Sequence, residues 1–373
     1  MRTLLGLALV LPLLATVACG GDTVYIHDSI DLDWDFQLTR PSVDASLHTP
    51  YVKGAQVKIT ISDSDDDVDV SRWRVVSENE AVFVARGVTA SGTSALDVDG
   101  LAVSAGTADL VVYDGAHERA RTTLEVAAAD RVELDANAWL VIGREAEARV
   151  DQVRFVEGGE ATYLVRYFAG ARELYGSGAL SFALPPGVAG EARRTYFSED
   201  REWLAVNAES AAAGELQLGA DGSLVTNVPV AVVPASDVDR VEIHGQDESK
   251  AHAGDYLVAM AQAYDVNDRR VLGMHFLWSV DGVGAQGDGD LYRYEFEPGK
   301  DAELVAQSDD FAHSASAMVH GGEGFVDSSN NTGCAIGAPG GAQGGRSGQG
   351  AMVLVLVLGG AVAVRRGRRA RAA

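Results

Sequence analysis

Short runs in which apolar and polar residues alternate fill the chain between Ile26 and Val326. In residues 57–61 (VKITI) the apolar side chains fall on one face of an extended strand, and in residues 292–297 (YRYEFE) the aromatic ones do. Gly, Asp, Asn and Ser separate the runs, which is the pattern of short strands joined by turns. Because long stretches of helical period occur only near the two chain ends, the pattern predicts an all-β protein rather than an α/β enzyme fold.

A weak internal repeat predicts how the strands group. Residues 130–134 (DRVEL) recur 109 positions later as residues 239–243 (DRVEI), each time directly after a strand-like run. That interval is the length of one immunoglobulin-like domain. We therefore predict tandem immunoglobulin-like β-sandwiches, with domains at 46–128, 129–235 and 236–326, of which the middle one is the least regular.

The first of these domains resembles the bacterial Ig-like group 2 family. The segments that carry the resemblance are 54–61, 73–77 (WRVVS), 78–82, 87–90 and 106–112, and the third domain repeats the outline in 254–264, 276–282 (FLWSVDG) and 302–306. The resemblance implies a central strand with a buried tryptophan, Trp73 in the first domain and Trp278 in the third. In the middle domain, residues 163–167 take the central place without a tryptophan.

The N-terminus has the pattern of an export signal, which we assign to residues 1–18. Arg2 precedes an apolar run over 4–15, and residues 16–19 (TVAC) follow. This ending resembles a bacterial lipobox, which implies that Cys19 is diacylated and becomes the mature N-terminus. The alternative is an ordinary signal-peptidase cleavage after Ala18, leaving Cys19 as a free thiol. Residues 19–45 form a lead-in to the first domain.

The C-terminus carries a second sorting pattern. A Gly-rich linker at 327–350, which contains Cys334, precedes an apolar run at 351–364 and an arginine-rich tail at 365–373. As a helix the run reaches about 21 Å, short of a bilayer core of roughly 30 Å. The basic tail predicts that everything upstream lies outside the cytoplasm. The arrangement resembles the MYXO-CTERM tags of myxobacterial surface proteins, which implies processing and attachment at Cys334; a plain single-span anchor is the alternative.

Net charge and cysteine content exclude one class of partner and one source of stability. The chain has 54 acidic and 30 basic residues, a formal charge of −24 and a pI near 4.6, so its field repels nucleic acid and we exclude that partner. Its two cysteines are the two predicted processing sites. No disulfide can therefore stabilise the domains between them, which depend on hydrophobic burial.

The sequence matches known catalytic motifs poorly. Residues 282–287 fit G-x-G-x-x-G, but a strand-like run follows rather than a helix, so we interpret them as a strand connection. The sequence has no H-E-x-x-H and no G-x-S-x-G. Carboxylates are too many for a glycosidase pair to be inferred from sequence.

The best candidate site is an acidic loop in the first domain, formed by Asp63, Asp65, Asp66, Asp67 and Asp69. Dense carboxylates suit Ca²⁺, the only cofactor that we consider, although the spacing is not that of an EF-hand. A solvated loop that adds solubility is the alternative. Asp281, Asp288 and Asp290 form a sparser set of the same kind in the third domain.

These observations favour a non-catalytic, envelope-anchored surface protein with a structural or adhesive role. Its predicted location is the cell envelope, at the outer membrane or cell surface and facing outside the cytoplasm. Its partners would be the membrane, through the lipid or the C-terminal helix, and a polysaccharide or another surface protein. An accessory or hydrolytic enzyme acting on envelope polysaccharide is the alternative, as is a spacer without a ligand. Trp139, Trp203 and Tyr175 would support sugar binding if exposed, and we expect them to be buried.

Overall fold

A computed structural model describes residues 24–28, 47–63, 69–90, 95–194, 201–246, 256–287, 289–295, 297, 299–320 and 324–325. The predicted signal peptide, both cysteines and the C-terminal apolar run lie outside these residues. Among the described residues no helix is both long and apolar enough to cross a membrane.

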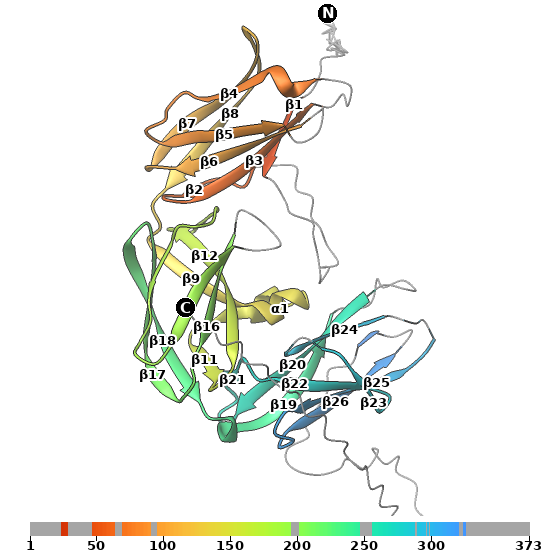
Figure 1. The fold of residues 1–373 in the computed structure, drawn as a ribbon. Coiled ribbons are helices and arrows are strands. Elements are labelled where there is room, and N and C mark those ends of the chain that lie inside the picture. The colour runs from red at the N-terminus through yellow and green to blue at the C-terminus, as the bar shows by residue number, and fades with distance from the viewer. Residues whose placement is uncertain are drawn as a thin grey trace, which may run out of the picture. The chain divides into compact units, whose positions relative to one another are not determined.

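The first sandwich is formed by β1 to β8, shown in red to orange in Figure 1. Its sheets have the orders β1-β3-β6-β5 and β2-β8-β7-β4. The elements are β1 (Val24–Asp28), β2 (Tyr51–Val52), β3 (Gln56–Asp63), a 3-10 turn η1 (Val70–Arg72), β4 (Trp73–Ser77), β5 (Phe83–Ala90), β6 (Ala95–Ala102), β7 (Gly106–Asp114) and β8 (His117–Ala127). The predicted lead-in thus contributes β1, which pairs antiparallel with β3.

The second sandwich is formed by β9 to β18, in yellow and green. One sheet has the order β10-β9-β12-β16-β15 with β13 also on β12, and the other has the order β11-β18-β17-β14. The elements are β9 (Arg131–Ala136), α1 (Asn137–Val141), α2 (Glu145–Ala148), β10 (Arg149–Val150), β11 (Val153–Val156), β12 (Glu160–Ala169), β13 (Arg172–Leu174), β14 (Leu180–Ala183), β15 (Ala189–Arg194), β16 (Glu202–Asn207), β17 (Ala212–Ala220) and β18 (Ser223–Val233).

The third sandwich follows a second 3-10 turn, η2 (Ala235–Asp237). One sheet has the order β19-β20-β21 with β24 on β20, and the other has the order β23-β22-β25-β26-β27. The elements are β19 (Val238–Gly245), β20 (Tyr256–Asp265), β21 (Arg270–Val271), β22 (Phe276–Val280), β23 (Val283–Ala285), β24 (Leu291–Glu295), β25 (Ala302–Ser308), β26 (Ser314–His320) and β27 (Gly324–Phe325).

The chain is therefore all-β, with immunoglobulin-like sandwiches in tandem, and the fold-class prediction is confirmed. The alternating run in β3 buries Val57, Ile59 and Ile61, as a period of two requires. Trp73 on β4 and Trp278 on β22 are both buried. The exact domain limits stay a prediction, because strand bounds do not define them.

Residues 282–287 belong to a strand connection, as expected. Val280 pairs with Val283 across a two-residue turn, in which Asp281 and Gly282 have φ values of 50° and 77°. Positive φ at both central positions is the type I′ geometry that suits a tight hairpin, and it favours the Asp-Gly pair found here. Since β24 follows and no helix opens there, the segment has no helix terminus to hold a pyrophosphate.

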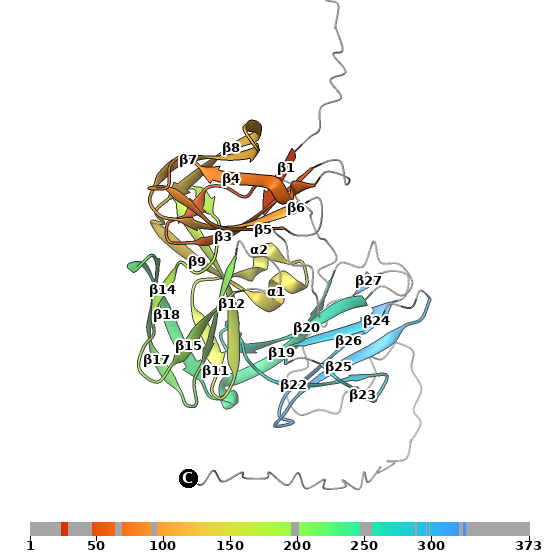
Figure 2. The same cartoon turned by 45° about the horizontal axis from the view of Figure 1, so that its top comes forward.

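Two short helices, α1 and α2, interrupt the second sandwich after β9 (Figure 2). Sequence analysis missed them because segments of 5 and 4 residues are too short to show a helical period. Trp139 on α1 is buried. On α1, Ala138 and Val141 are buried as well, whereas α2 buries only Ala148.

The hydroxyl group of Tyr163, in the core of the second sandwich, leads to a prediction about stability. The Tyr163 side chain on β12 is fully buried, and among the described residues its hydroxyl has no hydrogen-bond partner. Burial raises the pKa of this phenol, so it stays neutral. Tyr163→Phe should leave the free energy of unfolding unchanged or raise it by up to about 1 kcal/mol, because an unpaired buried hydroxyl is unfavourable.

The matched control is Tyr167→Phe, four residues along the same strand. The Tyr167 hydroxyl donates to the carboxylate of Glu202, so its removal should lower the free energy of unfolding by about 1–3 kcal/mol. Urea unfolding of both variants measures the difference. Equal losses in the two variants would mean that Tyr163 has a partner, such as a buried water.

Candidate functional site

The acidic loop of the first sandwich lies only partly within the described residues. Asp65, Asp66 and Asp67 are outside them, and of Asp63 only the backbone, at the end of β3, is described. Asp69 is the N-cap of η1, and its Oδ1 accepts a hydrogen bond of 3.0 Å from the Ser71 amide. Hydrogen bonds from Ser71 lower the pKa of Asp69, so this carboxylate has a local structural role.

The sparser acidic set of the third sandwich also lies only partly within the described residues. Asp281 occupies the turn between β22 and β23, where its Oδ1 accepts a hydrogen bond of 2.9 Å from the Glu303 amide of β25. The Asp290 carbonyl accepts from Ala261, and Asp288 lies outside the described residues. Within the described ranges, no group of three or more His, Cys, Asp or Glu side chains is arranged to hold a metal. Calcium at either set stays a prediction.

The three aromatic residues that bear on sugar binding differ. Trp139 is buried, and its Nε1 donates to Gln262 Oε1 at 3.0 Å. Trp203 on β16 and Tyr175 are half-buried, which departs from the expectation for those two. Tyr175 stacks on His48 with ring centroids 5.1 Å apart, and the Arg201 guanidinium carbon lies over the Tyr175 ring, 4.5 Å from its centroid. The Tyr175 ring is therefore in contact with two neighbouring side chains.

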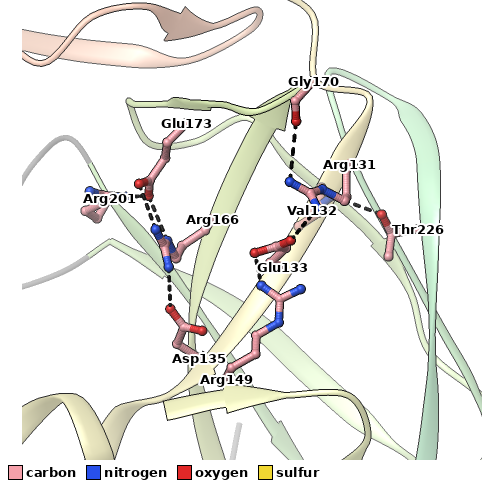
Figure 3. Close-up of polar contacts among 10 residues, drawn as sticks. All are labelled: Arg131, Val132, Glu133, Asp135, Arg149, Arg166, Gly170, Glu173, Arg201 and Thr226. Atoms are coloured by element: carbon pink, nitrogen blue, oxygen red, sulfur yellow. Dashed lines mark hydrogen bonds and ion pairs between the residues drawn. The ribbon is translucent and has the colours of Figure 1, made fainter. Parts of the chain in front are cut away.

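A polar cluster lies on the outer face of the β9–β12 sheet, drawn in Figure 3. Arg166 donates two hydrogen bonds of 2.8 Å to the Glu173 carboxylate and one of 3.2 Å to Asp135. Arg201 also contacts Glu173. A second set beside it links Arg131 and Arg149 through Glu133. Positions on this face alternate along β9 with Val132 and Leu134, which point into the core.

The two carboxylates around Arg166 have opposite pKa shifts. Burial raises the pKa of Asp135, although Arg166 acts to lower it. Burial also acts on Glu173, but hydrogen bonds and charges from Arg166 and Arg201 lower its pKa to about 2. Opposed shifts are a feature of acid–base pairs. Here each carboxylate is held by guanidinium groups, which is the arrangement of a structural salt-bridge network.

Glu202 on β16 is a second buried carboxylate. Its two oxygens accept hydrogen bonds from the Gly178 amide at 2.8 Å and the Leu180 amide at 2.9 Å, besides the Tyr167 hydroxyl. Burial raises its pKa, and these hydrogen bonds act in the opposite direction. The residue thus ties residues 178–180 to the core of the second sandwich.

An open cavity of about 370 Å³ lies where the second and third sandwiches meet. At its base Arg154 of β11 forms an ion pair of 2.8 Å with Asp265 of β20. Both residues are buried. Arg269 donates to the same Asp265 oxygen at 2.8 Å, while the Asn267 and Arg269 amides donate to the other. The remaining lining residues are Ser236–Asp239 and Val266.

Further bonds cross the same junction. Leu272 forms two main-chain hydrogen bonds across it: its carbonyl accepts from the Val156 amide, and its amide donates to the Arg154 carbonyl, both at 3.0 Å. From α1, the Val141 carbonyl accepts a hydrogen bond of 3.0 Å from Gln246. Because main-chain and buried polar groups are paired across it, this junction is a packed interface rather than a linker.

Comparison with known proteins gives only distant likenesses. No protein-family model matches the sequence, and no curated protein matches it. The resemblance to the group 2 family therefore stays a prediction.

Among solved structures, domains 4–9 of the surface-layer protein SbsC match with 14% identity and a TM-score of 0.31, over 73% of this chain and 42% of that one. The Escherichia coli adhesin FdeC matches with 11% identity and a TM-score of 0.24, over 82% and 96%. InvD of Yersinia pseudotuberculosis matches with 12% identity and a TM-score of 0.23, over 74% and 96%. The chain spans less than half of the first SbsC structure. Our fold assignment rests on the strand order of this chain.

Proposed function

We propose that this protein is a non-catalytic surface protein of the bacterial envelope, with a structural or adhesive role. The observation that supports it best is the packed junction between the second and third sandwiches. Main-chain hydrogen bonds and the buried Arg154–Asp265 pair cross that junction. A scaffold or spacer needs such a connection because it must hold its domains at a fixed spacing.

The surroundings of two buried carboxylates also support a non-catalytic role. The carboxylates with raised pKa, Asp135 and Glu202, are enclosed by hydrogen bonds to other groups of the protein. A general acid needs contact with substrate, whereas these groups fasten strands and loops together. Attachment through Cys19, Cys334 or both, and location at the cell surface, belong to this proposal on the strength of the two sorting patterns in the sequence.

Attachment is tested in the producing cell with the full chain and the variants Cys19→Ala and Cys334→Ala. We expect the full chain in the envelope fraction and accessible to protease added outside intact cells. Each variant that removes a real attachment site should release the protein into the medium or retain its uncleaved terminus. Wild-type protein in the cytoplasmic fraction would contradict the proposal.

The role is tested with the soluble body, residues 22–326. Saturable binding to whole cells or to isolated envelope polysaccharide would show an adhesive role, and absence of binding would leave a structural one. Release of soluble sugar from the same polysaccharide would instead show a hydrolase and overturn the proposal.

Calcium is tested on the same body. If the acidic loop binds Ca²⁺, the melting temperature should rise between chelator and millimolar Ca²⁺, because a ligand of the folded state alone stabilises it. A variant with Asn at positions 65, 66 and 67 should lose that rise. An unchanged melting temperature in the wild type would leave the loop as a solvated acidic segment.

A further inference from the structure

Residues Tyr175–Ser177, here called the strap, belong to the second sandwich but form backbone hydrogen bonds with the first. The Val52 amide donates to the Tyr175 carbonyl at 2.8 Å, and the Tyr175 amide donates to the Pro50 carbonyl at 2.9 Å. Gln56 and Ser177 exchange two further bonds, of 2.7 and 3.1 Å. The strap is thus a short stretch of β-structure shared between two sandwiches.

The strap reaches both sheets of the first sandwich. Tyr175 pairs in parallel with Tyr51 on β2, and Ser177 pairs antiparallel with Gln56 on β3. These two strands belong to different sheets. If the strap left, four backbone hydrogen-bonding groups of the first sandwich, at Pro50, Val52 and Gln56, would lose their partners.

Gly176 allows this close approach. It is buried with φ of 108°, and a Cβ placed on it would lie 2.6 Å from the Cβ of Ala55. Any larger residue would therefore push the strap away from the first sandwich. Ion pairs flank the contact: Lys53 with Asp221 at 2.7 Å, and Arg172 with Glu125 at 2.7 Å.

The residues that follow the strap are bound to the second sandwich. The buried Glu202 carboxylate holds Gly178 and Leu180, which follow the strap directly. The buried apolar side chains of the first and second sandwiches form one continuous cluster, whereas most of those of the third form a separate one. Separate domains that share few contacts open independently, but shared main-chain bonds and a shared core couple their opening.

We propose that the first and second sandwiches open as one cooperative unit, because the strap completes both sheets of the first from within the second. The inference concerns residues 24–233 and does not depend on the proposed surface role. It also explains why a carboxylate as costly to bury as Glu202 lies beside the strap.

Native-state hydrogen exchange of the body in rising denaturant tests the coupling without any variant. Amides of β3 and β7 in the first sandwich should share one opening transition with those of β9 and β12 in the second. Exchange of β3 and β7 at clearly lower denaturant than β9 and β12 would overturn the proposal.

A matched pair of glycine variants tests the role of the strap. Gly176→Ala and Gly170→Ala both add a methyl group at positive φ in the second sandwich, but nothing lies within 4 Å of a Cβ at Gly170. Gly176→Ala should speed exchange in the first sandwich about tenfold relative to the second, as expected for the loss of about two net hydrogen bonds. Gly170→Ala should affect both sandwiches alike. Equal behaviour of the two variants would contradict the role of the strap, and should Gly176→Ala fail to fold, the wild-type experiment decides.

Discussion

Replacing Asp265 by Asn should destabilise the protein by roughly 3–5 kcal/mol, because it leaves the buried guanidinium of Arg154 without its counter-ion. Asp265 Oδ2 accepts from Arg154 and Arg269, while Oδ1 accepts from the amides of Asn267 and Arg269. Asn retains an oxygen for the two amides but presents an NH₂ group to the two guanidiniums. The substitution therefore removes the negative charge at residue 265 while it keeps an acceptor for the two amides of the 265–269 turn. The midpoint of urea unfolding measures the effect.

Asp268→Asn is the matched control. It removes a carboxylate three residues away that pairs with Arg240 at 2.6 Å, but whose side chain is 81% exposed. An exposed ion pair contributes about 0–1 kcal/mol, so this variant should be nearly neutral. Arg154→Met should cost less than Asp265→Asn, since Asp265 keeps Arg269 and two amides. Equal effects of Asp265→Asn and Asp268→Asn would show that the Arg154 pair does not stabilise the junction.

Acid should weaken the second sandwich through Glu173 (Figure 3). The pKa of this carboxylate falls from 4.5 to about 2 in the folded protein. A carboxylate with a lowered pKa stabilises the fold above its unfolded pKa, and that contribution disappears as the pH falls through the folded pKa. The window therefore lies between about pH 4.5 and 2, and the contribution at neutral pH is on the order of 3 kcal/mol.

Glu173→Gln tests this dependence. We expect the variant to be less stable than the wild type near pH 7 and to approach it near pH 2, as measured by urea unfolding at several pH values. Asp135 acts in the opposite direction, since a raised pKa gives stability that is present at low pH and lost as the pH rises. Glu118→Gln is the control, because the Arg121 pair that lowers the pKa of Glu118 lies at the exposed surface. If the difference in free energy of unfolding between the wild type and Glu173→Gln stayed constant between about pH 4.5 and 2, the lowered pKa of Glu173 would be refuted.

The candidate sites show the limits of sequence patterns. The dense aspartates at 63–69 stand out in the sequence, yet the one whose side chain is described, Asp69, caps a 3-10 turn. Glu173 and Glu202 carry no such signal, because neither stands in a motif. Their partners, Arg166 and Tyr167, come from β12. Because strand pairing brings these partners together, the residues next to them in the sequence do not reveal the contact.

What the sequence determined by itself is the fold class and strands such as β3, β9 and β19, but not the short helices α1 and α2. Alternation in residues 57–61 and the repeated segment at 130–134 and 239–243 predicted strands that the structure contains, since a period of two depends only on neighbouring residues. Only the tertiary structure decided how the sandwiches join. The strap, the Arg154–Asp265 pair and the contact of α1 with Gln246 each unite residues far apart in the chain. Their pairing depends on how the sandwiches pack, and local periodicity carries no information about that packing.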